Sequence, residues 1–213
     1  ALNNICRNYA VSDTYEPGSP SKVFTVASAM EEGAINGNET YNCRGFEEIG
    51  GWKIRCANRN GHGEINVTEA LMESCNVAMM DISRTEGGQN FYKYQKVFGF
   101  GSKTDIDLHG EADTSGLVHT ADNAGATDLA TNSFGQNYNV TMVQVAAAYS
   151  SVVNGGAYYT PHVVKQILNP NGSVIKNIEP ELVRETVSAH TTAFINEALR
   201  RTVAEGTGSA AAV

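Results

Sequence analysis

The sequence lacks the features of several protein classes. No apolar run approaches the roughly 20 residues that a helix needs to cross a bilayer, and the first residues have no signal-peptide layout. No run of lysine and arginine occurs, and the formal net charge is -8, whereas nucleic acid requires a basic surface. We therefore expect no nucleic-acid partner, and we expect any membrane anchor to lie outside this chain.

Proline and cysteine are also scarce. Five prolines against 21 glycines predict tight turns between short elements rather than a proline-rich linker. The four cysteines, Cys6, Cys43, Cys56 and Cys75, form no C-x-x-C pair and no metal-ligand spacing with His62. We therefore predict no metal site and no cofactor.

The remaining composition is that of an ordinary globular protein. Hydrophobic residues make up 41% and charged residues 18% of the 213 residues. A chain of this length can bury one sizeable core or two small ones.

The most informative stretch is residues 15–33, YEPGSPSKVFTVASAMEEG. Ser19 followed by Pro20 is typical of a helix start, because serine caps free N–H groups and proline fits the first helical position. Apolar residues then recur at helical spacing as far as Gly33. The pattern predicts a buried helix that begins at Pro20.

Lys22 is unusual in this helix, because the first turn is the positive end of the helix dipole, where an acidic side chain is favoured. Three residues after Ser19, its amine lies within reach of the serine hydroxyl. Burial and the dipole both lower the pKa of a lysine, and a neutral amine can take a proton from serine. The spacing therefore predicts Ser19 as a nucleophile and Lys22 as its base, although a capped helix with a solvated lysine has the same pattern.

Residues 40–58 predict a β-hairpin in which YNCRGF and WKIRCA flank a turn at 49–51. Pairing about this turn places Cys43 opposite Cys56, where a disulfide can form in an oxidising compartment. The alternative is that both are small buried hydrophobes.

A polar group interrupts a helical stretch further along. Asn66 to Glu69 predicts a helix cap, and Ser74-Cys75-Asn76 then breaks the helix before it resumes as VAMMDISRTEG. Side chains two residues apart at such a break can point into one cavity, which a continuous helix does not permit. In the purely structural alternative, Ser74 ends one helix and Asn76 caps the next.

The rest of the chain predicts helices over 89–98, 141–154 and 188–205, and short strands over 157–178. Segment 123–139 is rich in glycine and amides, with SFGQ at its centre. In the helix capped by Thr141, we expect the stripe that faces the core to be Met142, Val145, Ala146, Tyr149 and Val153.

Together these segments resemble the transpeptidase domain of class B penicillin-binding proteins. Residues 15–33 resemble the nucleophile helix of that family, and SCN resembles its second motif, S-x-N. GFGSKTDIDLHGEA, SFGQ, AAAYSSVVNGG and EGTGSAAAV resemble further family segments in the expected order. The resemblance covers essentially the whole chain and implies a single, partial domain over residues 1–213, with the α+β fold of penicillin-binding transpeptidases and serine β-lactamases.

The resemblance implies a serine D,D-transpeptidase that crosslinks peptidoglycan stem peptides and is a target of β-lactams. Ser19 would attack the penultimate D-Ala carbonyl, and Lys22 would deprotonate Ser19. Ser74 would relay a proton toward the leaving amine. Asn76 would hydrogen-bond the substrate amide and contact Lys22.

The same resemblance implies further partners and a location. Gly135 and Gln136 of SFGQ would contact the substrate. The protein would work on the extracytoplasmic face of a bacterial cell membrane, beside membrane-embedded proteins of cell-wall synthesis.

The chain departs from the family in its third motif, Lys-Ser/Thr-Gly, which lies on a strand beside the nucleophile and supplies part of the oxyanion hole. No such triplet occurs, and the near match Lys103-Thr104-Asp105 corresponds to a different family loop. The motif would follow the last residue, and the opening strands would precede the first. We therefore expect the helical part of the domain with small β-hairpins, most of the central five-stranded sheet missing, and weak or no activity of these residues alone.

Two other functions remain open. A β-lactam sensor or β-lactamase relative shares the serine and lysine but needs a base for a hydrolytic water, and no residue at the expected positions identifies one. A non-catalytic module that binds the cell wall would keep the Ser19 cluster only as a vestige.

Overall fold

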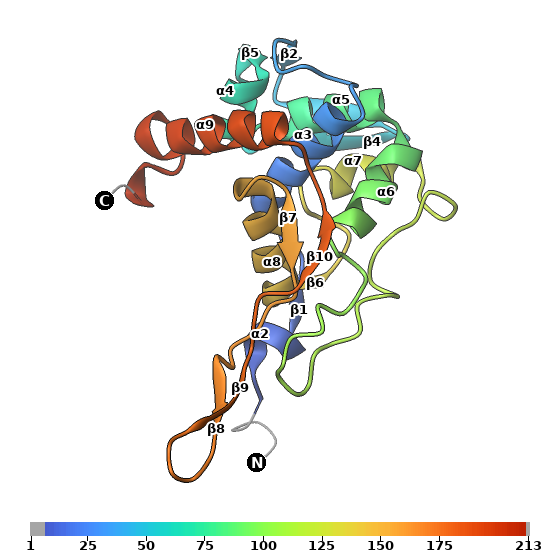
Figure 1. Cartoon of the computed structure of the whole chain (residues 1–213). Helices are drawn as coiled ribbons and strands as arrows, with labels where there is room; N and C mark the ends of the chain where they lie inside the picture. The colour runs from blue at the N-terminus through green and yellow to red at the C-terminus, as the bar shows by residue number, and fades with distance from the viewer. Residues whose placement is uncertain (1–6, 212–213) are drawn as a thin grey trace.

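A group of packed helices forms the centre of the molecule, and short strands pair in twos around it (Figure 1). The computed structural model describes residues 7–211. The helices there are α2 (Tyr9–Ser12), the 3-10 helix η1 (Ser19–Ser21), α3 (Lys22–Glu31), α4 (Val67–Met72), α5 (Asn76–Glu86), α6 (Gly88–Val97), α7 (Ala126–Asn132), α8 (Met142–Val153), α9 (Ala189–Glu205) and the 3-10 helix η2 (Ser209–Ala211).

All the strand pairs are antiparallel and two-stranded. The pairs are β1 (Thr14–Tyr15) with β6 (Val140–Thr141), β2 (Thr40–Cys43) with β5 (Gly63–Asn66), β3 (Phe46–Ile49) with β4 (Trp52–Arg55), β7 (Ala157–Tyr159) with β10 (Leu182–Glu185), and β8 (Gln166–Leu168) with β9 (Val174–Asn177). This combination of helices and small hairpins confirms the predicted α+β class.

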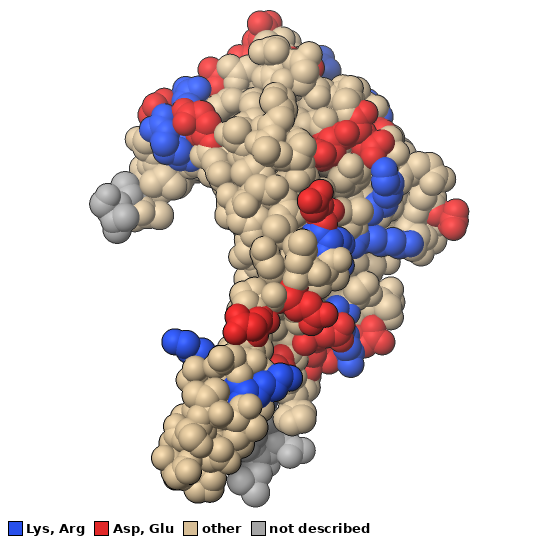
Figure 2. Space-filling view, in the orientation of Figure 1, with Lys and Arg blue, Asp and Glu red and all other residues tan. Residues whose placement is uncertain are grey.

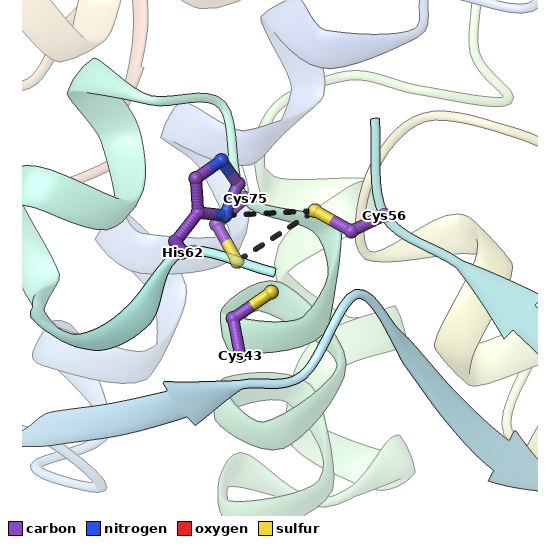
Figure 3. Close-up of side chains that lie close together, drawn as sticks. All are labelled: Cys43, Cys56, His62 and Cys75. Carbon is purple, nitrogen blue, oxygen red and sulfur yellow. Dashed lines mark hydrogen bonds between the residues drawn. The ribbon is translucent and has the colours of Figure 1, made fainter. Parts of the chain in front are cut away.

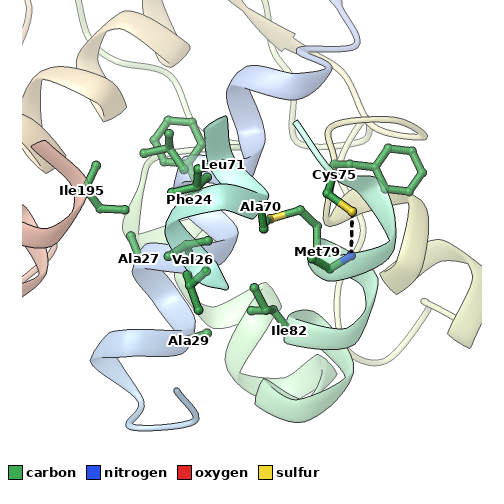
Figure 4. Packing of buried hydrophobic residues seen from close by; sticks show 14 of the residues in the cluster. Phe24, Val26, Ala27, Ala29, Ala70, Leu71, Cys75, Met79, Ile82 and Ile195 are labelled. Carbon is green, nitrogen blue, oxygen red and sulfur yellow. Dashed lines mark hydrogen bonds between the residues drawn. The ribbon is translucent and has the colours of Figure 1, made fainter. Parts of the chain in front are cut away.

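Helix α3 lies at the middle of the core, and every residue from Lys22 to Met30 is buried. It packs against α5, α6 and α9, which together surround it. Figure 4 shows its aliphatic side chains facing Leu71 of α4, Ile82 of α5 and Ile195 of α9. Because interiors of this kind are close-packed, the start of α3 is held on a rigid base.

Three of the predicted helix caps are confirmed. Asn66 and Glu69 form a reciprocal capping box at the start of α4, and Thr141 forms one with Gln144 at the start of α8. The Ser188 hydroxyl caps α9 as predicted.

The predicted turn at 49–51 is present, but the register around it differs from the prediction. Cys43 belongs to β2 and lies opposite Gly63 of β5, whereas β3 pairs with β4. Gly45, at a φ of 86°, turns the chain between the two pairs, and a Cβ there would lie 2.3 Å from the Arg59 carbonyl oxygen. Cys43 and Cys56 are therefore not cross-strand partners, and both are free thiols, so the predicted disulfide is not formed.

The predicted core-facing stripe of α8 is correct only in part: Val145 and Tyr149 are partly buried and pack against the core, whereas Met142, Ala146 and Val153 are exposed. The buried residues of the helix are Gln144, Ala148, Ser151 and Val152, while the side chain of Met142 is 52% exposed. The helix is apolar on nearly every side, so periodicity could not select the face that packs.

The exposed surface is mixed in charge. Figure 2 shows acidic and basic side chains interspersed on the face drawn, with no continuous basic area. Within residues 7–211, no helix combines the length and the apolar character that crossing a membrane requires.

Candidate active site

Ser19 lies at the N-terminal end of the central helix and is exposed to solvent. The helix was predicted to begin at Pro20; in the structure the 3-10 helix η1 begins one residue earlier, at Ser19, and α3 continues it from Lys22. The predicted cap is wrong: Gly18 holds the N-cap position, and no side chain caps the turn. The Ser19 hydroxyl instead accepts hydrogen bonds from Lys22 Nζ at 3.1 Å and from Ser74 Oγ at 2.8 Å.

The turn that carries Ser19 is held on both sides by the rest of the chain. The Gly18 N–H donates to the Gly135 carbonyl at 2.8 Å, and the Tyr149 hydroxyl donates to the Pro20 carbonyl at 2.7 Å. The Gly18 N–H is one of the donors that the start of a helix leaves without an intrahelical partner, and the bond from Tyr149 ties the same turn to α8. They fix the position of the Ser19 backbone while its side chain stays accessible.

Lys22 is buried, with only 2% of the residue exposed. Its Nζ donates to the Ser74 carbonyl at 2.6 Å and to Ser74 Oγ at 2.7 Å, in addition to Ser19. Burial lowers the pKa of Lys22 to about 8, although the charges of nearby Cys56 and Cys75 oppose this shift. A sizeable fraction of the amine is therefore neutral at pH values close to neutrality.

Ser74 stands in the predicted break between α4 and α5. Its φ is 53°, in the left-handed region that side chains other than glycine rarely adopt. This conformation costs about 1–2 kcal/mol, and it turns the hydroxyl toward Ser19 and Lys22. The strain at this position supports a functional rather than a purely structural role for the break.

Asn76 begins α5 and is half-buried. Its Nδ2 donates to the Arg55 carbonyl at 3.1 Å. Among the described residues, the Lys22 amine binds Ser19 and Ser74 only, so the expected contact between Lys22 and Asn76 is not formed. Asn76 is nonetheless only two residues from Ser74.

Gly135 of the SFGQ segment packs directly against the turn that carries Ser19. It has a φ of 86°, and a Cβ at this position would lie 2.0 Å from the Gly18 carbonyl oxygen. Gly135 therefore positions the turn through its backbone. Gln136 is exposed, and the substrate contacts predicted for these two residues stay predictions.

Two tyrosines support the site, and neither was predicted from the sequence to be part of it. Tyr149 holds Pro20, and the hydroxyl of Tyr138 shares a 2.7 Å hydrogen bond with Ser21 Oγ. One sequence signal could have pointed to them: a tyrosine in a buried stripe needs a hydrogen-bond partner for its hydroxyl. That rule does not identify the partner, since both bonds join segments more than a hundred positions apart.

Ser19, Lys22 and Ser74 thus form a closed ring of side-chain hydrogen bonds, which we call the Ser–Lys–Ser ring. Each distance in the ring, 3.1, 2.7 and 2.8 Å, is within the range for proton transfer between a nucleophile and its base. A buried amine is joined to an exposed hydroxyl both directly and through a second hydroxyl. This arrangement suits acyl transfer through a serine.

Comparison with known proteins points to one family. The family model for the penicillin binding protein transpeptidase domain matches residues 2–213. Stage V sporulation protein D of Bacillus subtilis is 39% identical over 204 residues, which cover 95% of this chain and 31% of that protein. PbpB of Mycolicibacterium smegmatis is 32% identical over 213 residues, which cover 97% of this chain and 32% of that protein.

A solved structure shows the same fold. Penicillin binding protein 3 of Mycobacterium tuberculosis, in complex with aztreonam, superposes with a TM-score of 0.86 at 28% identity, over 97% of this chain and 47% of that one. The chain spans about a third of the length of the curated relatives described above. Because the family model matches nearly every residue, the chain belongs to the penicillin-binding protein transpeptidase domain family.

Proposed function

We propose that this protein is a serine D,D-transpeptidase that crosslinks peptidoglycan stem peptides through an acyl-enzyme on Ser19. The observation that carries the proposal is the Ser–Lys–Ser ring, which joins an exposed hydroxyl to a buried amine. The family of the chain supports the same reaction class. From that family we also propose that it acts on the extracytoplasmic face of a bacterial membrane, with membrane-embedded cell-wall proteins as partners.

In the proposed reaction, each member of the ring carries out one step. The neutral Lys22 amine takes the proton of Ser19, and Ser19 Oγ attacks the penultimate D-Ala carbonyl. The resulting tetrahedral adduct expels the terminal D-Ala, whose amine receives a proton through Ser74 Oγ, which touches both other groups. An amine of a neighbouring strand then attacks the ester, loses its proton to the ring and frees the Ser19 hydroxyl.

A β-lactam would enter the same first step. Ser19 Oγ would open the lactam ring, and the cleaved amine would stay attached to the acyl group, so the whole inhibitor would remain on the protein. The aztreonam complex of the Mycobacterium tuberculosis relative supports this proposal.

Mass spectrometry of the full chain after incubation with benzylpenicillin tests the proposal. We expect one adduct with the mass of the intact inhibitor, on the peptide that contains Ser19, and none in Ser19→Ala. An adduct on another residue would contradict it. Continuous hydrolysis of a chromogenic cephalosporin would favour a β-lactamase relative, and cell-wall binding without any adduct would favour a non-catalytic module.

The acylation rate is expected to depend on pH through Lys22. The amine acts as a base only when neutral, and its pKa is about 8, so the rate should fall below this pH and level off above it. Well below the pKa, each unit of pH should lower the rate by about tenfold. Stopped-flow acylation by a fluorescent penicillin from pH 6 to 10 measures the profile, and a rate independent of pH would show that Lys22 is not the base.

The 213 residues taken alone are expected to acylate slowly. They contain no Lys-Ser/Thr-Gly triplet, and the loss of one oxyanion donor costs about 3 kcal/mol of transition-state stabilisation, or roughly a hundredfold in rate. Labelling with a fluorescent penicillin, compared with a longer chain that carries the triplet, measures this difference. Rapid stoichiometric labelling of the 213 residues would show that the triplet is dispensable.

A further inference from the structure

A second cluster of reactive side chains lies beside the active site and takes no part in the Ser–Lys–Ser ring. We call it the Cys–His cluster; it consists of Cys43, Cys56, His62 and Cys75 (Figure 3). The three cysteines are buried free thiols, and the histidine is half-buried. Figure 3 shows the three sulfur atoms and one imidazole nitrogen turned toward a common centre.

The distances within the cluster match those of a tetrahedral metal site. All four ligand atoms lie within 4.8 Å of one another, with 3.9 Å between the sulfurs of Cys56 and Cys75 and 3.8 Å from Cys56 Sγ to His62 Nδ1. Two thiolates bound at about 2.3 Å to one tetrahedral zinc are about 3.8 Å apart, and a bound thiolate and imidazole nitrogen are about 3.5 Å apart. The two pairs that involve Cys56 are within a few tenths of an ångström of these values, and the widest separation, at most 4.8 Å, would shorten by about 1 Å on binding.

Backbone N–H groups at the start of α5 donate to two of the three sulfurs. The backbone N–H of Asn76 donates to Cys56 Sγ at 3.4 Å, and the N–H of Ala78 donates to Cys75 Sγ at 3.4 Å. Both donors belong to the first turn of α5, where the helix dipole stabilises negative charge. Backbone hydrogen bonds of this kind also orient the ligands of structural metal sites.

We propose that the three thiolates and the imidazole of the Cys–His cluster bind one Zn²⁺ ion in a closed, structural site. Three soft thiolates with one imidazole in a tetrahedral arrangement suit zinc better than hard cations such as calcium or magnesium. On binding, the thiols would release their protons, and no electron transfer is needed. Cys43 ends β2, Cys56 follows β4, His62 precedes β5, and Cys75 lies in the break between α4 and α5. The ion would therefore join strands to helices.

The site would act on the catalytic residues through its position. Cys75 lies between Ser74 and Asn76, and Cys56 follows Arg55, whose carbonyl binds the Asn76 side chain. A metal bound to Cys56 and Cys75 would therefore hold both sides of the strained break that presents Ser74. The sequence predicts no metal site here, because these ligands have none of the short repeats along the chain that identify zinc knuckles.

The metal content of the full chain, purified in zinc-containing buffer and dialysed, tests the proposal without reference to activity. We expect about one zinc per chain, and intense visible absorption from cobalt–thiolate bonds after replacement by Co²⁺. His62→Gln should weaken zinc binding more than about 100-fold, since even an outer-shell change costs 10–100-fold. His62→Cys should retain the zinc, and His109→Gln, at an exposed histidine outside the cluster, should bind as the parent does.

Two measurements guard against misfolding and oxidation. The melting temperature should fall when a chelator removes zinc from the parent and from His62→Cys, and the chelator should have no effect on His62→Gln. A metal-free parent, a site filled by copper or iron from the same buffer, equal zinc content in parent and His62→Gln, or a Cys56–Cys75 disulfide in the isolated protein would each overturn the proposal.

Discussion

Replacing Lys22 by methionine is expected to slow the acylation of Ser19 by a β-lactam by about 10²–10⁴-fold, the usual contribution of a positioned general base. Methionine has nearly the length of lysine and tolerates burial, so the packing of this buried position should be largely kept. What the variant removes is the amine that joins Ser19 to Ser74. The second-order rate constant for a fluorescent penicillin measures the loss.

The matched control for this substitution is Lys93→Met. Lys93 lies on α6, with its side chain 57% exposed, and forms an ion pair with Glu32 on the surface. Exposed pairs contribute about 0–1 kcal/mol, so acylation and stability should stay close to those of the parent. If Lys22→Met acylates within a few-fold of Lys93→Met while both remain folded, the base is another group.

The sequence was sufficient to predict the parts of the site that depend on local structure. Lys22 lies three positions after Ser19, where η1 continues into α3, so their proximity follows from helical geometry. The break at Ser74 was also predictable, since a polar triplet interrupts an apolar helix. The hydrogen bond between Ser74 and Ser19 joins residues 55 positions apart, which no local pattern predicts. It was predicted from the resemblance to the family.

The errors concern features set by tertiary packing. The hairpin register moved because Gly45 directs β2 to pair with β5, which a pattern around one turn does not reveal. The buried face of α8 depends on what packs against an apolar helix. The Asn76 side chain binds Arg55, a residue with no sequence signal that links the two. In each case a long-range contact overrode a correct local pattern.

Replacing Gly135 by alanine is expected to lower the free energy of unfolding by about 2–5 kcal/mol and to slow acylation at least about 100-fold. Part of the cost is conformational, because Gly135 has a φ of 86°. The larger part is steric, because the new Cβ would lie 2.0 Å from the Gly18 carbonyl oxygen and would push the Ser19 turn away from Ser74. Chemical denaturation and the acylation rate measure the two effects.

Gly172→Ala separates these two contributions. Gly172 has a φ of 85°, almost the same as Gly135, but a Cβ there would meet no atom within 4 Å. It lies in the exposed turn between β8 and β9, so alanine should cost only the conformational term of about 1–2 kcal/mol and leave acylation unchanged. If the two variants lose the same stability and acylate equally fast, the close contact between Gly135 and Gly18 does not position the nucleophile. If Gly135→Ala alone loses acylation while it remains folded, the SFGQ segment acts on the reaction by fixing the backbone on which Ser19 is carried.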